Sequence, residues 1–211
     1  MKNLKSILSL ILILALVLFS AGCSSGSAPA TGSNNNQTAG NDSGDKPQEK
    51  TVSIGIIQIV EHPALDAARE GFLETLKANG LEVGKNLVVD YQNAQNDQSI
   101  LNNIAQKFAS AKHDLILAIA TPSAQAVAAA TSEIPILITA VTDPVAAKLV
   151  NSLEKPGTNV TGTTDMNPID EQFELLVKLV PNAKNVGIVY NAGEVNSQVQ
   201  VEIAKQVAAE L

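Results

Sequence analysis

Thr121-Pro122-Ser123-Ala124 forms the turn whose chemistry is easiest to interpret in this 211-residue chain. Thr121 is a predicted N-cap and Pro122 a predicted first helical residue, because each type favours that position. The Ser123 and Ala124 amides and the Ser123 hydroxyl would then point outward at the positive end of a helix dipole. This arrangement predicts a binding site for a small anion such as a carboxylate. An ordinary capped strand-to-helix turn is the alternative interpretation.

Polar residues also gather in other short segments that follow predicted strands. In an open parallel sheet, ligands bind beyond the carboxyl ends of the strands, where loops and helix N-termini meet. These segments are therefore candidate parts of a binding site, and they span 58–62, 93–97, 121–123, 142–144, 163–165 and 191–197.

The two histidines give no metal signature, because neither has a second metal-type ligand at helical spacing. His62 precedes Pro63 in a strand-to-helix loop, where it either contacts a ligand or is simply exposed. His113 lies beside Asp114 and is expected on the surface. Asp143 and Asp165 follow predicted strands, so each either caps a turn or faces the ammonium of a ligand.

Catalytic patterns are absent from the sequence. It contains no Gly-x-Ser-x-Gly elbow, no phosphate-binding glycine loop with lysine, no dinucleotide fingerprint, and no Ser/His/Asp set in a plausible order. We therefore predict a protein that is not an enzyme and needs no cofactor. The formal charge of −7, with no basic stripe, argues against nucleic acid as a partner.

The elements that must position these residues alternate along the chain. Residues 51–60 are a nearly unbroken β-branched run, as in a parallel strand covered on both faces. Apolar residues at helical spacing follow over 65–76, and Asn79-Gly80 is a stop signal. The pattern repeats with strands at 87–91, 115–120 and 136–140 and helices at 97–109, 122–130 and 144–150. It predicts a doubly wound α/β fold with a parallel sheet.

A second group of predicted strands and helices begins after Lys155-Pro156-Gly157. Residues 160–163 suit a fifth strand, 168–180 an amphipathic helix, 186–190 a buried strand and 197–211 another helix. One strand and two helices cannot form a second sheet, and no capping residue closes 204–211. We therefore expect a nearly complete first lobe at 51–163 and the incomplete start of a second α/β lobe at 164–211, in the front part of a longer protein.

The N-terminus has the order of an export signal. Lys2 and Lys5 precede an apolar run at 7–19 and the small residues Ser20-Ala21-Gly22-Cys23. This site resembles a bacterial lipobox, which implies a signal peptide at 1–22 and lipid attachment at Cys23, the only cysteine. Residues 23–50 lack large apolar residues and are expected to form a disordered tether. A simple cleaved signal and a retained anchor are the alternatives, and both export the rest.

The folded part resembles a known family of binding proteins. The segments IGIIQIVEHPALDAAREGF, ATPSAQA, ITAVTDPVAAKLV, KPGTNVTGTTDMNPIDEQ and VGIVYNAGEVNSQVQ are similar to the substrate-binding lipoproteins of ABC importers, in the family that includes tryptophan- and tyrosine-type binding proteins. The resemblance implies a type I periplasmic-binding-protein fold, a ligand between two lobes, and ABC permease and ATPase partners. It also implies a lipid anchor on the outer face of the cell membrane, with no other membrane contact.

The same resemblance implies which residues face the ligand: Gln58, His62, Thr121, Ser123, Ala124, Thr142, Asp143, Asp165, Tyr190, Asn191, Glu194 and Asn196. Only Tyr190 offers an aromatic ring at a strand end near the expected cleft. Because sugar binders of this fold stack rings on several aromatic side chains, an amino acid, in particular an aromatic one, is the favoured ligand. A sugar or nucleoside ligand, a sensor that signals to a membrane receptor, and a purely structural lipoprotein are the alternatives.

Overall fold

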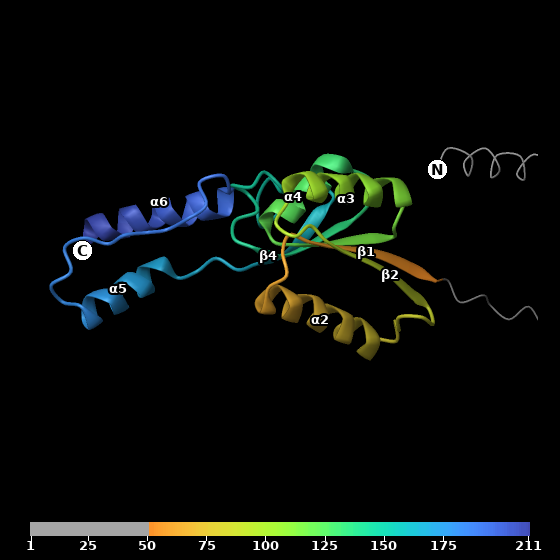
Figure 1. Cartoon of the computed structure of the whole chain (residues 1–211), viewed down its shortest axis with the longest axis horizontal. Helices are drawn as coiled ribbons and strands as arrows, with labels where there is room; N and C mark the ends of the chain where they lie inside the picture. Colours follow the sequence, from red (N-terminus) through yellow and green to blue (C-terminus); the bar gives the residue numbers. More distant parts are fainter. Residues whose placement is uncertain (1–50) are drawn as a thin grey trace, which may run out of the picture. The chain divides into compact units, whose positions relative to one another are not determined.

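The computed structural model describes residues 51–211, and the predicted signal peptide, lipidated Cys23 and tether lie outside these residues. Along the chain it has, in order, β1 (Val52–Gln58), α2 (Pro63–Ala78), β2 (Leu87–Asn93), α3 (Gln98–Ala111), β3 (Leu115–Ile119), α4 (Thr121–Ala130), β4 (Ile136–Val141), β5 (Val160–Thr164), α5 (Ile169–Leu179) and α6 (Val195–Glu210) (Figure 1). Among residues 51–211, no helix has the length and apolar content needed to cross a bilayer.

The strands form one parallel sheet in the order β2-β1-β3-β4-β5. Strand β1 pairs on both sides, with Val52 opposite Leu87 of β2 and Ile54 opposite Leu115 of β3. Its β-branched residues suit a pleated surface that is covered on both faces. The predicted α/β fold with a parallel sheet is confirmed.

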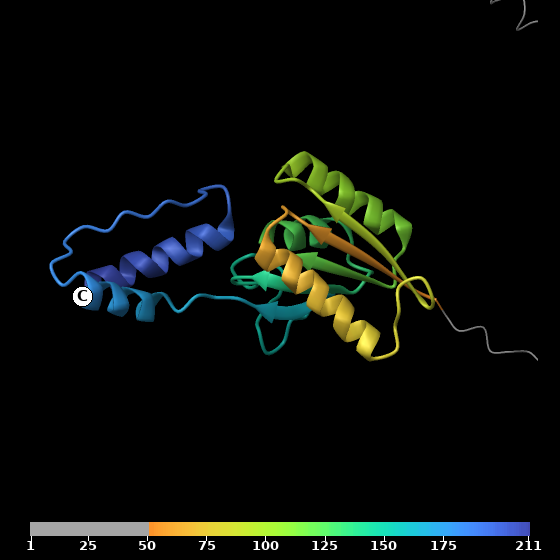
Figure 2. The ribbon, with the colours of Figure 1, turned by 60° about the horizontal axis from the view of Figure 1, so that its bottom comes forward.

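Helices cover both faces of this sheet (Figure 2). Helix α2 packs over a cluster that includes Ile54, Ile56 and Leu117. On the other face, Leu101 and Phe108 of α3 pack with Ile57 and residues of α4. Successive β1 side chains therefore serve opposite core layers, which is the period-two alternation of an extended strand.

The helix predicted at 144–150 is wrong. The backbone makes only one turn, in which the Ala147 amide donates to Asp143 O at 3.0 Å and the Leu149 amide donates to Pro144 O at 2.9 Å. Lys148 then adopts a left-handed conformation with φ of 59°. A right-handed helix cannot continue through such a residue, so the segment ends as a turn.

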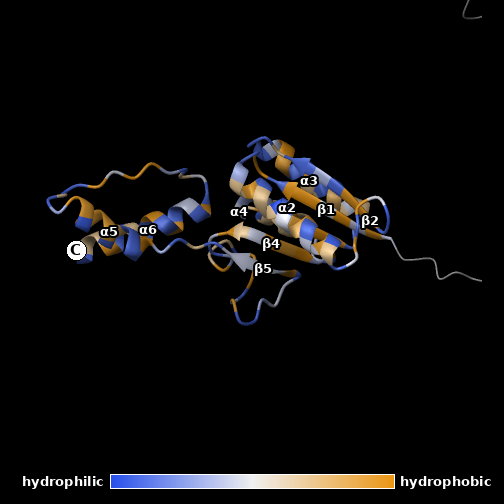
Figure 3. Ribbon diagram, turned by 90° about the horizontal axis from the view of Figure 1, so that it is seen from below, coloured by the Kyte–Doolittle hydropathy of each residue, from blue (hydrophilic) through white to orange (hydrophobic). Residues whose placement is uncertain are grey.

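The buried strand predicted at 186–190 is also wrong. This segment of the described structure forms no strand and is exposed, with Val189 fully open to solvent. Its apolar character is visible in Figure 3, in the long connection that joins α5 to α6. A strand needs a neighbour for its backbone groups, and residues 51–211 place none beside it. The flanking helices pack on each other instead. Asn167, just before α5, donates through Nδ2 to Gln200 Oε1 of α6 at 2.6 Å.

His113 is buried, contrary to the surface position predicted for it. Its side chain is only 9% exposed, and its ring meets the Phe108 ring edge-on with centroids 5.1 Å apart. Ser53 Oγ lies 2.8 Å from His113 Nδ1. Gly55 makes room for both rings, because a Cβ there would lie 2.8 Å from Phe108 and 2.9 Å from His113.

We expect Gly55→Ala to lower the free energy of unfolding by about 1–3 kcal/mol, because overpacking a core forces the rings to shift. Gly71→Ala is the matched control, since a Cβ on this helical glycine meets no atom within 4 Å. It should raise stability by roughly 0.5–1 kcal/mol through helix propensity. Urea denaturation measures both, and equal effects of the two substitutions would contradict the packing of Gly55.

Burial makes His113 a source of acid sensitivity. It lowers the pKa of His113 below the ordinary value of 6.5; Lys107 lowers the pKa further, whereas Asp90 and Asp114 oppose the shift. The unfolded chain then binds a proton more readily than the folded one, so this contribution to stability is present above pH 6.5 and is lost as the pH falls toward the folded-state pKa.

We expect the free energy of unfolding to fall less between pH 7.5 and pH 5 in His113→Gln than in the parent protein. Denaturant titrations at both pH values give the comparison. An unchanged acid slope in His113→Gln would show that the buried ring is not its source.

Candidate ligand-binding site

Four neighbouring strands end at the same edge of the sheet. Gln58 at the end of β1 is opposite Ile119 in β3, and Val141 at the end of β4 is opposite Thr164 in β5. The ends of these strands and the segments after them carry eight of the predicted ligand-binding residues: Gln58, His62, Thr121, Ser123, Ala124, Thr142, Asp143 and Asp165. The order of the strands therefore brings these eight to one edge.

Backbone strain is concentrated at this edge. Ala120 directly follows β3 and has φ of 78° and ψ of 155°, a region that glycine occupies almost exclusively. Ala140, near the end of β4, has a φ of 55°. Such residues persist only where the surrounding structure imposes them, and they are frequent at ligand sites.

The start of α4 differs from the predicted cap. Ala120, not Thr121, is the N-cap, and the Ala124 amide donates to Ala120 O at 3.1 Å, so this amide does not point outward. The prediction was wrong because the strained Ala120 lets the helix begin one residue earlier. The amide of Ser123 still belongs to the first turn, where helical amides have no partner within the helix.

Buried oxygens without partners mark the ends of β1 and β3. The Thr121 and Ser123 hydroxyls are buried and, within residues 51–211, have no hydrogen-bond partner. Gln58 is fully buried; its Nε2 donates to Val60 O at 2.8 Å and to Asp66 Oδ1 at 2.9 Å, but its Oε1 has no partner. An unsatisfied buried group costs about 1–3 kcal/mol, so these three oxygens require an explanation.

The side chains of His62 and Asp143 both accept hydrogen bonds from backbone amides two or three residues further along the chain. His62 Nδ1 accepts from the Ala64 amide at 3.2 Å as the N-cap of α2. Asp143 Oδ1 accepts from the Val145 and Ala146 amides, each at 2.9 Å. The capping alternative therefore describes Asp143, whereas Asp165 is exposed at the end of β5. His62 Nε2 and Asp143 Oδ2 are left for other contacts.

The other four predicted residues make local contacts. Asn191 Nδ2 and Asn196 Nδ2 donate to the two carboxylate oxygens of Glu194, at 2.8 and 3.2 Å. Tyr190 lines a mainly apolar groove of about 340 Å³ with residues of α5 and α6. Within 51–211, no hydrogen bond joins these four residues to the sheet edge, so their role in binding stays a prediction.

A further pocket at the ends of β1 and β2 includes two residues that the sequence did not single out, Arg69 and Tyr91. Arg69 has the pattern of a solvated helix residue and Tyr91 that of a strand residue, so no local signal marked either one. In the described part of the chain, no three His, Cys, Asp or Glu side chains are grouped to hold a metal ion.

A family model described as ABC transporter substrate binding protein matches residues 53–211. The chain belongs to this family. This substrate-binding protein is 50% identical over 199 residues to the tyrosine-binding protein of Clostridioides difficile, a match that covers 94% of this chain and 55% of the relative. The family predicted from the sequence is therefore confirmed.

Solved structures agree in fold. A conserved domain protein from Vibrio cholerae is 51% identical with a TM-score of 0.75, and an ABC domain in complex with L-Trp from Streptococcus pneumoniae is 39% identical with a TM-score of 0.74. Each match covers 76% of this chain and 54% of the other. The substrate-binding protein thus spans about half the length of the relatives it matches.

The strain at Ala120 gives a test of the edge geometry in this substrate-binding protein. Ala120→Gly should raise the free energy of unfolding by about 1 kcal/mol, because glycine relieves strain of roughly 1–3 kcal/mol and loses only one methyl group and some chain entropy. Ala128→Gly, inside α4, is the matched control and should destabilise by about 1 kcal/mol. If chemical denaturation shows the same loss for both variants, the left-handed conformation of Ala120 is excluded.

Proposed function

We propose that this substrate-binding protein is an extracytoplasmic lipoprotein of an ABC importer that binds an aromatic amino acid at the carboxyl edge of its sheet. The observation that carries the proposal is the set of unpartnered buried oxygens of Gln58, Thr121 and Ser123 at that edge. A tyrosine-binding relative and a related structure in complex with L-Trp support the ligand class.

The chemistry of these groups matches both ends of an amino acid. Hydroxyls of Thr121 and Ser123 can donate to an α-carboxylate, and the first-turn Ser123 amide adds a donor at the positive helix end. The Gln58 amide oxygen can only accept, as can Asp143 Oδ2 and the Asp165 carboxylate, which suits an α-ammonium. Charge-assisted hydrogen bonds of this kind contribute about 1.5–3 kcal/mol each.

The anchoring and transport parts of the proposal have a different basis. The lipobox-like sequence that ends at Cys23 supports a lipid anchor on the outer face of the membrane. Membership of the family supports ABC permease and ATPase subunits as partners. Residues 164–211 would contribute to the second wall of the cleft together with the remainder of a lobe such as the longer relatives possess.

Calorimetric titration can follow binding. With the protein at its full gene-encoded length, we expect saturable binding of L-tryptophan and displacement by L-tyrosine or L-phenylalanine. Ser123→Ala should weaken binding by about tenfold or more, the loss of one charge-assisted bond. Ser132→Ala replaces an exposed serine just beyond the other end of α4 and should leave binding unchanged.

Competition with tryptamine tests directly whether Thr121 and Ser123 bind the ligand's carboxylate. Tryptamine keeps the ring and ammonium of tryptophan but lacks the carboxylate, so we expect it not to displace L-tryptophan. Displacement at equal concentrations by the amine and the amino acid would contradict carboxylate binding at Thr121 and Ser123. Failure of all three aromatic amino acids to bind would overturn the proposed ligand class.

A further inference from the structure

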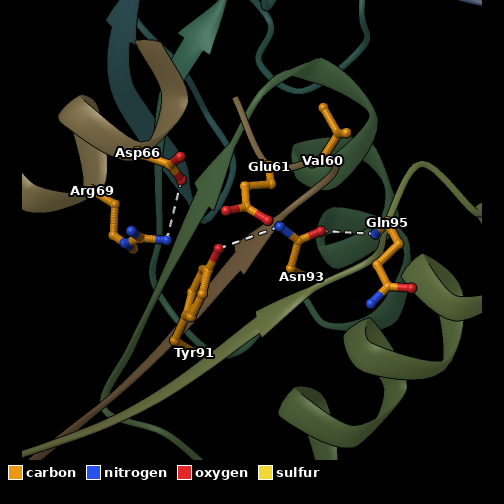
Figure 4. Close-up of a pocket in the computed structure, with 7 residues that line it drawn as sticks. All are labelled: Val60, Glu61, Asp66, Arg69, Tyr91, Asn93 and Gln95. Carbon is orange, nitrogen blue, oxygen red and sulfur yellow. Dashed lines mark hydrogen bonds and ion pairs between the residues drawn. The ribbon is translucent and has the colours of Figure 1, made fainter. Parts of the chain in front are cut away.

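A second pocket lies at the same edge of the sheet, where β1 and β2 end beside α2, and none of the residues predicted to contact the amino acid lines it (Figure 4). Its volume is about 540 Å³, which is within the range of small-molecule sites. Apart from Val60, polar and charged side chains from four adjoining segments line it: Glu61, Asp66, Arg69, Tyr91, Asn93 and Gln95.

The only cationic side chain of the pocket lining is already engaged. The Arg69 guanidinium carbon lies 4.3 Å from the centroid of the Tyr91 ring, and one of its nitrogens lies 3.3 Å from Asp66 Oδ1. Its other terminal nitrogen lies 3.8 Å from the Glu70 carboxylate. Arg69 thus forms a fixed wall with its charge compensated by carboxylates, so it does not make the pocket an anion site.

Glu61 supplies a negative charge that nothing in the described residues neutralises. Its side chain is exposed beside the pocket, and no hydrogen bond or ion pair is formed by its carboxylate within 51–211. The side-chain amide of Gln95 also has no partner there. Tyr91 Oη accepts from Asn93 Nδ2 at 3.4 Å and can still donate or accept once more.

The loop that carries Gln95 is held in an uncommon backbone conformation. Gln95 and Asn96 are consecutive non-glycine residues with φ of 53° and 62°. Two hydrogen bonds fix them and a third holds the residue before them: Gln95 N donates to Asn93 Oδ1 at 2.8 Å, Asn96 N to Ile59 O at 2.8 Å, and Ala94 N to Gln58 O at 2.9 Å. The backbone of the loop is therefore preorganised, and Gln95 lines the pocket.

We propose that this pocket binds a small organic cation that carries an ammonium or guanidinium group. The cation pairs with Glu61 and donates hydrogen bonds to Gln95 Oε1 and Tyr91 Oη, while the Arg69–Tyr91 wall bounds its carbon chain. Because Glu61 is exposed, the ion pair is screened by water and salt, and the affinity is modest and falls with ionic strength. This site does not depend on the proposed amino-acid site.

Calorimetric titration of the full-length protein with agmatine and putrescine at low ionic strength tests the proposal. We expect saturable binding of both, weakened by added salt, and no binding of 1,4-butanediol, the neutral analogue of putrescine. Glu61→Gln should weaken binding by about threefold to fivefold, the scale of an exposed ion pair. Glu74→Gln changes the same charge at an exposed position of α2 outside the pocket and should leave the affinity within about twofold.

The outcome that overturns the proposal is an absence of saturable agmatine binding, or equal agmatine binding by Glu61→Gln and the parent protein. If circular dichroism shows that Glu61→Gln is unfolded, Gln95→Ala replaces it and should weaken binding by a smaller but measurable factor. Agmatine should not displace bound L-tryptophan. Loss of cation binding and loss of amino-acid binding are therefore separate results, and either can occur without the other.

Discussion

The parallel pairing of β1 between β2 and β3 is the constraint on which the rest of the described structure depends. Every backbone group of a central strand must find a neighbour, and β1 finds one on each side. Because all five strands run in the same direction, their carboxyl ends meet at one edge. The polar segments after β1, β3, β4 and β5 are therefore neighbours in space although they are far apart in sequence.

Gln58 connects this constraint to the site. It continues the face of β1 that carries Ile54 and Ile56, so packing buries it completely. A buried amide needs partners, and its nitrogen finds them in Val60 O and in Asp66 of α2. Asp66 in turn fixes Arg69 over Tyr91. One buried side chain thus links the end of β1 to both the proposed amino-acid site and the neighbouring cation pocket.

Fold and function rest on different observations in this protein. The packed sheet and its structural relatives define the architecture, but one fold serves many ligands. The chain spans about half the length of its relatives, and hinge-closing proteins bury ligands between two lobes. The ligand proposal therefore depends on particular atoms, namely the unpartnered oxygens of Gln58, Thr121 and Ser123, and not on the architecture.

The sequence alone determined the elements whose signals are local. The alternation of strand and helix patterns predicted β1 to β5 to within a few residues, and Asp97 and Asn79 bound α3 and α2 as their capping chemistry predicts. Only the tertiary structure decided that His113 is buried, that 186–190 forms no strand, and that Arg69 stacks on Tyr91. These outcomes depend on what long-range neighbours supply, whether space, strand partners or opposing charge, and a local pattern carries no information about them.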